Sequence, residues 1–189
     1  MIADNQIEIS TVFKEFEAEL YKTLAYWESH ALDNNNAGFI GQINFKNEKI
    51  EKASKGLILN TRILWSFAAV SNHLQTQQYA GTCNRAYHYL ALFFKDKADG
   101  GLYWELANNA KPESIQKNTV GQAYALLALC EYFLFSKKEE VKDWALSLFE
   151  YIEEFGFDTQ HNCYIDILKE KQTKDVQSIK IARSLGTHL

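Results

Sequence analysis

Apolar residues recur at three- and four-residue steps near the start of the chain and predict an amphipathic helix over residues 8–30. Its apolar positions are Ile9, Val12, Phe13, Phe16, Leu20, Leu24 and Trp27. The run Asp33-Asn34-Asn35-Asn36 ends this pattern, because Asp and Asn side chains compete for backbone hydrogen bonds. The next helix is expected over residues 55–74. It is apolar on almost every side, which is typical of a helix buried on most of its surface.

The same alternation continues along the chain. An amphipathic helix is predicted over residues 79–95, a buried one over 117–135, and an amphipathic one over 138–155. A further apolar-tending stretch runs from residue 179 to residue 189. The buried helices are expected to begin at Lys55, Lys117 and Ile179, so each start lies 62 residues after the previous one. A fixed period of helix pairs indicates a repeat architecture.

Three similar short segments mark the same repeat. They are Ala37-Gly38-Phe39-Ile40-Gly41, Gly100-Gly101-Leu102-Tyr103-Trp104 and Asn162-Cys163-Tyr164-Ile165-Asp166, which begin 63 and then 62 residues apart. Each is predicted to be a short extended turn that closes a helix pair. The 189 residues therefore hold about three helix pairs, and the expected fold is an all-α arc of an α/α toroid. Closing such a ring takes more pairs, so the chain is expected to be a half or incomplete barrel.

Charge and composition narrow the class of protein. The formal net charge is −4 and no basic stripe is present, which argues against a nucleic-acid partner. The first residues lack the pattern of a secretory signal, and no apolar run approaches the ~20 residues of a membrane span. Cys83, Cys130 and Cys163 are odd in number and far apart, as expected of reduced thiols that serve as packing residues. The chain is therefore expected to be cytoplasmic.

Few polar residues lie in the first turns of the buried helices, where a toroid opens its central cavity. They are Asn60, Thr61, Arg62, Asn118, Thr119, Gln122, Tyr124, Arg183, Ser184, Thr187 and His188. The second turn segment adds Tyr103, Trp104 and Glu105, groups that stack on a sugar ring and form hydrogen bonds with it. The residues expected to bind a substrate are Asn60, Tyr103, Trp104, Gln122 and Tyr124.

Arg62 is the most informative of these side chains. A guanidinium between Leu59 and Ile63 on a buried helix needs an acceptor, which can be a structural ion pair or a ligand. His188, near the chain end, has no orienting partner in the sequence, and a lone histidine of this kind is more often solvent-facing than a base.

The remaining histidines give no sign of a metal site. His30, His73, His88 and His161 lack metal-ligand spacing and an accompanying carboxylate cluster. Phosphate-binding and dinucleotide-binding loops are also missing from the sequence. Neither a metal nor a cofactor is therefore expected.

Residues 55–67 resemble the signature KGLILNxRILWxFS of the N-acylglucosamine 2-epimerase superfamily, most closely its cellobiose 2-epimerase branch. In this chain they read Lys55-Gly56-Leu57-Ile58-Leu59-Asn60-Thr61-Arg62-Ile63-Leu64-Trp65-Ser66-Phe67. Further segments are similar to family motifs: residues 38–41, 99–104, 121–124 with 131–132, and 183–189. The resemblance covers all 189 residues but only the first half of the family's length, so the chain is interpreted as a single N-terminal portion of a toroid domain, residues 1–189.

The resemblance implies a toroid of six helix pairs, a six-hairpin barrel, that epimerises or isomerises a mono- or disaccharide at C2 without a cofactor. Family histidines move the C2 proton through an enediolate, and Arg62 stands where the family has an arginine that can stabilise the oxyanion. His188 matches the first histidine of the family's THLH motif, and the other histidines would lie beyond residue 189. The isolated chain is therefore expected to be inactive unless a C-terminal half or a second chain completes it.

This chain departs from the family's pattern at two positions. Gly186 stands in place of an asparagine, and Val120 in place of an aromatic residue.

Two other functions stay open. One is a non-catalytic half-toroid that binds carbohydrate or assembles with a partner. The other is a toroid hydrolase or lyase, which needs two carboxylates about 5–9.5 Å apart, whereas Asp99, Glu105 and Asp166 lie on different turns.

Overall fold

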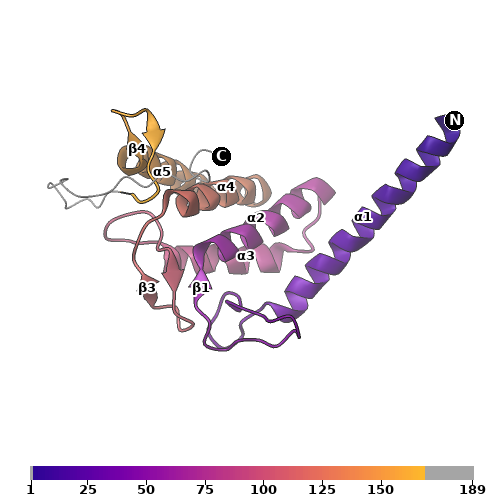
Figure 1. The fold of residues 1–189 in the computed structure, drawn as a ribbon, viewed down its shortest axis with the longest axis horizontal. Coiled ribbons are helices and arrows are strands. Elements are labelled where there is room, and N and C mark those ends of the chain that lie inside the picture. The colour runs from indigo at the N-terminus through magenta and orange to yellow at the C-terminus, as the bar shows by residue number, and fades with distance from the viewer. Residues whose placement is uncertain (1, 169–189) are drawn as a thin grey trace.

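The computed structural model describes residues 2–168, with side chains from residue 9 onward, and shows a mostly helical protein (Figure 1). Its helices are α1 (Ile2–His30), α2 (Leu57–Leu74), α3 (Ala80–Tyr89), α4 (Thr119–Ser136) and α5 (Glu139–Gly156). A π-helical segment, η1 (Leu90–Phe94), continues α3. The helices expected over 55–74, 117–135 and 138–155 are confirmed to within a few residues, and the one expected over 79–95 corresponds to α3 with η1.

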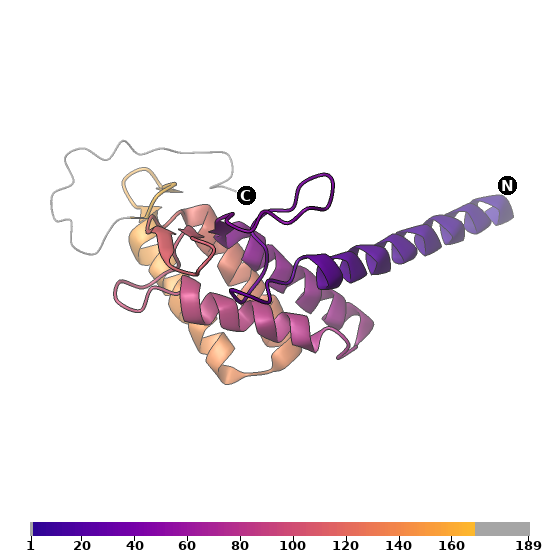
Figure 2. The same ribbon diagram turned by 90° about the horizontal axis from the view of Figure 1, so that it is seen from below.

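The two buried helices form the centre of the described fold. α2 packs along α4, whereas α3 covers α2 and α5 covers α4 (Figures 1 and 2). Two copies of one unit therefore lie side by side, the first copy being residues 31–94 and the second copy residues 95–156. This layering of inner and outer helices is the partial α/α toroid that the 62-residue period predicts. The expected helix over 179–189 lies outside the described residues.

Short antiparallel strands precede the inner helices. β1 (Lys55–Gly56), β2 (Glu105–Leu106) and β3 (Pro112–Ser114) form one small sheet, in which Gly56 faces Glu105. β4 (Phe157–Asp158) pairs with β5 (Cys163–Tyr164) after α5. Lys55 and Gly56 were expected in a helix and instead lie in a strand, because their backbone pairs with β2 before α2 begins.

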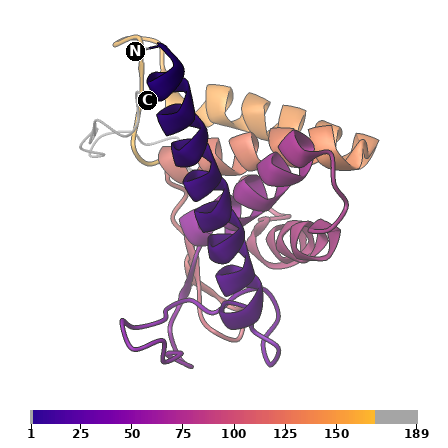
Figure 3. The same ribbon diagram turned by 90° about the vertical axis from the view of Figure 1, so that its right-hand side faces the viewer.

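α1 extends away from the other helices (Figures 1 and 2), and in the view from its own side it runs in front of them (Figure 3). Near its C-terminal end Leu24 is buried and Trp27 packs on the core. Earlier positions of its apolar stripe are solvent-exposed, with Phe13 at 68% and Phe16 at 69% of full exposure. Within the described residues, only the last turns of the apolar stripe of α1 are buried against the rest of the protein.

A buried ion pair joins each turn to the start of the following inner helix. In the first copy, Lys55 Nζ lies 2.7 Å from Asp33 Oδ2, and the exposed fractions of the two side chains are 1% and 6%. Asp33 Oδ1 also accepts hydrogen bonds from the backbone N–H groups of Asn35 and Asn36. Burial alone would raise the pKa of Asp33, but these donors outweigh it and hold that pKa below its usual value.

The second copy repeats this arrangement. Lys117 Nζ lies 2.7 Å from Asp96 Oδ2, and the backbone N–H groups of Ala98 and Asp99 bind Asp96 Oδ1. The pKa of Asp96 is likewise below its usual value, because hydrogen bonds from Lys117 and the turn outweigh the effect of burial. In the third turn segment Asp158 accepts the same two kinds of backbone hydrogen bond, but its other oxygen lies 2.7 Å from Nδ1 of His161.

A tyrosine of the outer helix packs against each turn. The Lys55 ammonium lies 5.1 Å from the ring centroid of Tyr89, and the Lys117 ammonium 5.9 Å from that of Tyr151. The same rings lie against Gly38 and Gly101, which both have positive φ. A Cβ atom at either glycine would approach the ring to 2.6 Å, so glycine is required there by space as well as by backbone conformation.

The cysteines differ in environment. Cys83 is fully buried, and burial raises the pKa of its thiol to about 11. This fits the packing role predicted for it. Cys163 is half-buried, and Cys130 is exposed in the part of the chain described, so the packing prediction is wrong for Cys130 there.

Replacing Lys55 by Met is expected to lower the free energy of unfolding by about 3–5 kcal/mol, because Asp33 keeps its charge in a buried site without a cation. Lys142→Met removes an exposed ion pair with Glu139 and is expected to leave the free energy of unfolding almost unchanged. Urea unfolding followed by circular dichroism measures both. Adding Asp33→Asn to Lys55→Met should recover part of the loss. Equal losses for the two lysine variants would contradict the prediction.

Candidate functional site

Arg62 and Tyr124 meet where the two inner helices lie together. An Nη atom of Arg62 donates a hydrogen bond to the Tyr124 hydroxyl at 3.1 Å, and the guanidinium carbon lies 5.0 Å from the centroid of the Tyr124 ring. The two residues are 62 positions apart, so they occupy equivalent places on α2 and α4. The repeat thus brings together two of the predicted site residues.

Arg62 is solvent-exposed, so the expectation that its guanidinium is buried is wrong. Its neighbours in the sequence of α2 are mostly apolar, but Arg62 lies on the side of the helix that faces solvent. Within residues 9–168, the ion pairs of the structure do not include Arg62. Its charge is therefore paired with a neutral hydroxyl, which leaves guanidinium N–H groups available for an anionic or polar ligand.

The same open face carries large apolar side chains. Trp65 follows Arg62 by one helical turn and is 40% exposed, and its equivalent on α4, Leu127, is 49% exposed. An arginine, a tyrosine hydroxyl and an indole on one surface suit a polyhydroxylated ring, which offers both hydroxyl groups and apolar C–H faces. The sequence pattern placed Trp65 in the core, and only its offset from Arg62 could have assigned it to this face.

Asn60 and Gln122 are equivalent residues of the two inner helices, and both are fully buried. The Gln122 amide accepts a hydrogen bond from the Leu102 N–H at 2.8 Å and donates one to the Leu102 carbonyl at 2.8 Å. Asn60 Nδ2 donates to the Gly56 carbonyl at 2.9 Å. Both side chains were expected to bind substrate. The structure instead places them behind the open face, where Gln122 ties α4 to the second turn.

Tyr103 and Trp104 are half-buried beside the starts of the inner helices. The Trp104 carbonyl accepts a hydrogen bond from the Leu57 N–H at 2.9 Å, and its indole packs over Gly121 of α4. Burial, followed by the charge and hydrogen bond of Asp96, raises the pKa of Tyr103. Trp104 therefore lies between the two copies, and Tyr103 is tied to the aspartate of its own turn.

Arg183, Ser184, Thr187 and His188 lie outside the described residues. In residues 9–168, no group of three or more histidine, cysteine, aspartate or glutamate side chains could hold a metal ion. Within the same part of the chain, no helix is both long and apolar enough to cross a bilayer.

Sequence comparison assigns this arrangement of helices and side chains to a family. Residues 38–181 match the family profile of N-acylglucosamine 2-epimerase. The chain belongs to the N-acylglucosamine 2-epimerase family. The matched region contains the second turn, the Asp96–Lys117 pair and the Arg62–Tyr124 pair, so the site described above lies within it.

Members of this family that resemble the chain include cellobiose 2-epimerases. The enzyme of Bacteroides fragilis is 31% identical over 184 residues, which are 93% of this chain and 47% of that protein. The enzyme of Dictyoglomus turgidum is 34% identical over 139 residues, or 74% of this chain and 36% of that protein. The chain thus spans about half the length of the Bacteroides fragilis enzyme.

Solved structures agree with this assignment. The cellobiose 2-epimerase of Bacillus thermoamylovorans superposes with a TM-score of 0.83 at 29% identity, over 95% of this chain and 48% of that one. A D-mannose isomerase has a TM-score of 0.73 at 20% identity, and it shares the fold. An α-mannanase of glycoside hydrolase family 76 from Bacteroides thetaiotaomicron, with a TM-score of 0.64 at 17% identity, also shares the fold alone.

Replacing Arg62 by Ala is expected to change the free energy of unfolding by less than about 1 kcal/mol, because the side chain is exposed and its partner is a neutral hydroxyl. A structural ion pair in a buried site would instead cost several kcal/mol. Urea unfolding distinguishes the two cases. A loss above about 3 kcal/mol would contradict an open, ligand-facing Arg62.

Gln122→Leu is expected to cost about 2–4 kcal/mol, since it leaves the buried N–H and carbonyl of Leu102 without the amide that binds them. Gln116→Leu serves as the matched control, because the Gln116 side chain is exposed, and its effect should stay within about 0.5 kcal/mol. Thermal unfolding of the two variants provides the measurement. A Gln122 variant as stable as the control would show that the amide acts elsewhere.

Proposed function

We propose that the protein is a sugar 2-epimerase or isomerase of the cellobiose 2-epimerase type, to which these residues contribute the N-terminal half of the ring and part of the sugar site. The observation that carries this proposal is the exposed Arg62, held by Tyr124 on the open face of two packed inner helices. The two curated relatives described above are cellobiose 2-epimerases, which supports the same class of reaction.

The chemistry proposed is removal and return of the proton at C2 of an aldose. A proton beside an aldehyde is weakly acidic. When a base removes it, the C–H electron pair forms a C1=C2 double bond and the aldehyde oxygen becomes the negatively charged oxygen of an enediolate. Arg62 is proposed to stabilise that oxyanion through its guanidinium N–H groups. Removing one positioned donor of this kind typically lowers the reaction rate by a factor of about 10²–10³.

The neighbours of Arg62 are assigned supporting roles. Tyr124 accepts a hydrogen bond from Arg62, so its own hydroxyl proton can be donated to a sugar oxygen. Trp65 offers an aromatic surface for the C–H face of the ring, and Tyr103 and Trp104 are proposed to contribute at the edge of the same mouth. Asn60 and Gln122 are proposed to position the helix starts.

The acid and base are proposed to be histidines outside the described residues, with His188 as the candidate in this sequence. Histidine suits the task because its pKa lies near neutral pH, so one side chain can take the proton and another can return it. Because the curated relatives are about twice as long, the 189 residues alone are proposed to bind sugar without turning it over.

Incubation with cellobiose in D₂O tests this proposal, with deuterium at C2 measured by NMR. The 189-residue chain alone is expected to incorporate none, whereas a chimera that adds the C-terminal half of the Bacteroides fragilis relative is expected to incorporate it. In the chimera, Arg62→Ala should reduce the exchange rate about 10²–10³-fold.

The controls separate binding from catalysis. Saturation-transfer NMR should show cellobiose binding by the 189-residue chain, and Arg62→Ala should weaken it. Exchange by the chain alone would refute the assignment of the acid and base to the other half. A folded chimera that binds cellobiose without exchange, with wild-type Arg62, would favour a non-catalytic carbohydrate-binding protein.

A further inference from the structure

The outer helices of the two copies align at the same 62-residue offset as the inner ones. Tyr89 and Tyr151 demonstrate this, since each ring packs on its own turn glycine and lies beside its own buried lysine. The same offset makes Ser147 on α5 the equivalent of Arg85 on α3. A large cationic side chain in one copy is thus replaced by a small neutral one in the other.

Arg85 fills the space between α3 and the first turn. Its Nε donates a hydrogen bond to the Gly38 carbonyl at 2.8 Å, and one Nη donates to the carbonyl of Asp33. The Gly38 carbonyl accepts at the same time from the Asp33 N–H at 3.2 Å. The turn of the first copy is therefore a bidentate acceptor for a planar guanidinium group.

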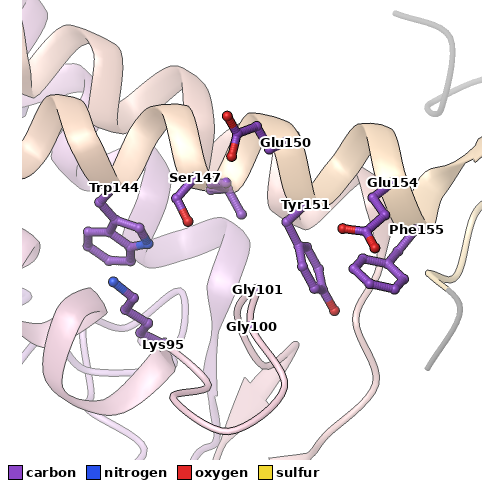
Figure 4. Close-up of a pocket in the computed structure, with 10 residues that line it drawn as sticks. Lys95, Gly100, Gly101, Trp144, Ser147, Glu150, Tyr151, Glu154 and Phe155 are labelled. Atoms are coloured by element: carbon purple, nitrogen blue, oxygen red, sulfur yellow. The ribbon is translucent and has the colours of Figure 1, made fainter. Parts of the chain in front are cut away.

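The second copy keeps the acceptors and lacks the arginine. The Gly101 carbonyl accepts from the Asp96 N–H at 3.0 Å, as Gly38 does from Asp33, and the Asp96 carbonyl accepts from the Gly100 N–H at 3.1 Å. A carbonyl has two lone pairs, so both retain the capacity that Arg85 uses in the first copy. A pocket of about 220 Å³ lies between α5 and this turn, with Gly100, Gly101 and Ser147 in its lining (Figure 4).

The walls of the pocket suit a cation with a flat face. Tyr151 points from α5 toward Gly101, and the Trp144 ring lies at the other end, where Lys95 Nζ approaches its centroid to 4.7 Å (Figure 4). The charged lining residues are Lys95, Glu150 and Glu154, which sum to a charge of −1. The first copy has His88 and Leu92 in place of the two glutamates, so the acidic rim occurs where the arginine is missing.

We propose that this pocket, the Ser147 pocket, binds a guanidinium group in the place that Arg85 occupies in the first copy. The group can be the arginine side chain of a partner polypeptide or a small guanidino compound. The carbonyls of Gly101, in the pocket lining, and of Asp96, in the same turn, are equivalent to the two that bind Arg85. Tyr151 provides an aromatic surface, and the glutamates provide the charge. The pocket lies between α5 and the second turn, and its lining does not include Arg62, Tyr124 or Trp65, so this function is separate from the proposed sugar site on the inner helices.

Titration with N-ethylguanidinium, followed by ¹H–¹⁵N NMR of the full chain, tests the proposal. Saturable shifts are expected for the amides of Gly100 and Gly101 and for the indole N–H of Trp144. Ethylammonium is the matched probe. It carries the same charge without the planar fork and should bind at least about five-fold more weakly. Equal binding of the two cations, or no saturable shift, would overturn the proposal.

Three variants test whether the NMR shifts arise from binding in the Ser147 pocket. Ser147→Arg should supply the missing side chain and abolish the N-ethylguanidinium shifts. Glu154→Gln leaves the packing in place and should weaken binding about three-fold or more, which keeps the test decisive if Ser147→Arg does not fold. Arg85→Ser should lower the melting temperature, and N-ethylguanidinium should restore part of it by binding the vacated first turn. Unchanged binding in both pocket variants overturns the assignment.

The peptide Gly-Arg-Gly with blocked ends separates the two sources of the group. A peptide affinity at least about ten-fold above that of N-ethylguanidinium supports a polypeptide partner, because backbone contacts then add to the side chain. A peptide affinity equal to or below that of N-ethylguanidinium supports a small guanidino compound.

Discussion

A buried aspartate–lysine pair holds the beginning of each described inner helix against the turn that precedes it. Asp33 binds Lys55, and Asp96 binds Lys117, both at 2.7 Å and both largely shielded from water. Removing such charges from water costs several kcal/mol, which is recovered only with close geometry and further hydrogen bonds. The backbone N–H groups of the turns provide those further bonds. The ion pair and the hydrogen bonds of the turn therefore depend on each other, and together they hold the turn against the start of the inner helix.

This constraint determines where Arg62 and Tyr124 stand. Lys55 lies seven positions before Arg62, and Lys117 seven positions before Tyr124, so the two ion pairs set the same axial height for both side chains. α2 and α4 then need only pack in parallel register for the guanidinium to reach the hydroxyl. In the third turn segment Asp158 lies next to His161 instead. Lys180 stands 22 residues after Asp158, the interval from Asp33 to Lys55, and lies outside the described residues.

The sequence allowed prediction of the helix pairs, because their apolar periodicity extends over many residues and recurs every 62. It did not reveal the strands of two or three residues, which are too short for any periodicity. It also misjudged the exposure of Arg62. A helix that is apolar on nearly every side gives no signal for which face stays open, so its pattern predicts that Arg62 and Trp65 are buried. Asn60 and Gln122 were chosen for their polarity, which equally suits a buried amide that binds a turn.

The two copies differ in an instructive way. Positions that agree between them hold the unit together: the aspartate, the lysine, the turn glycine and the outer-helix tyrosine. Two of the positions that differ lie at the sites proposed above to bind ligands, namely Arg62 against Tyr124 and Arg85 against Ser147. A repeat fold needs the first class in every unit, because each turn must be fixed in the same way. It leaves the second class free to vary, so at such positions a unit can acquire a binding or catalytic side chain without loss of the contacts that fix its turn.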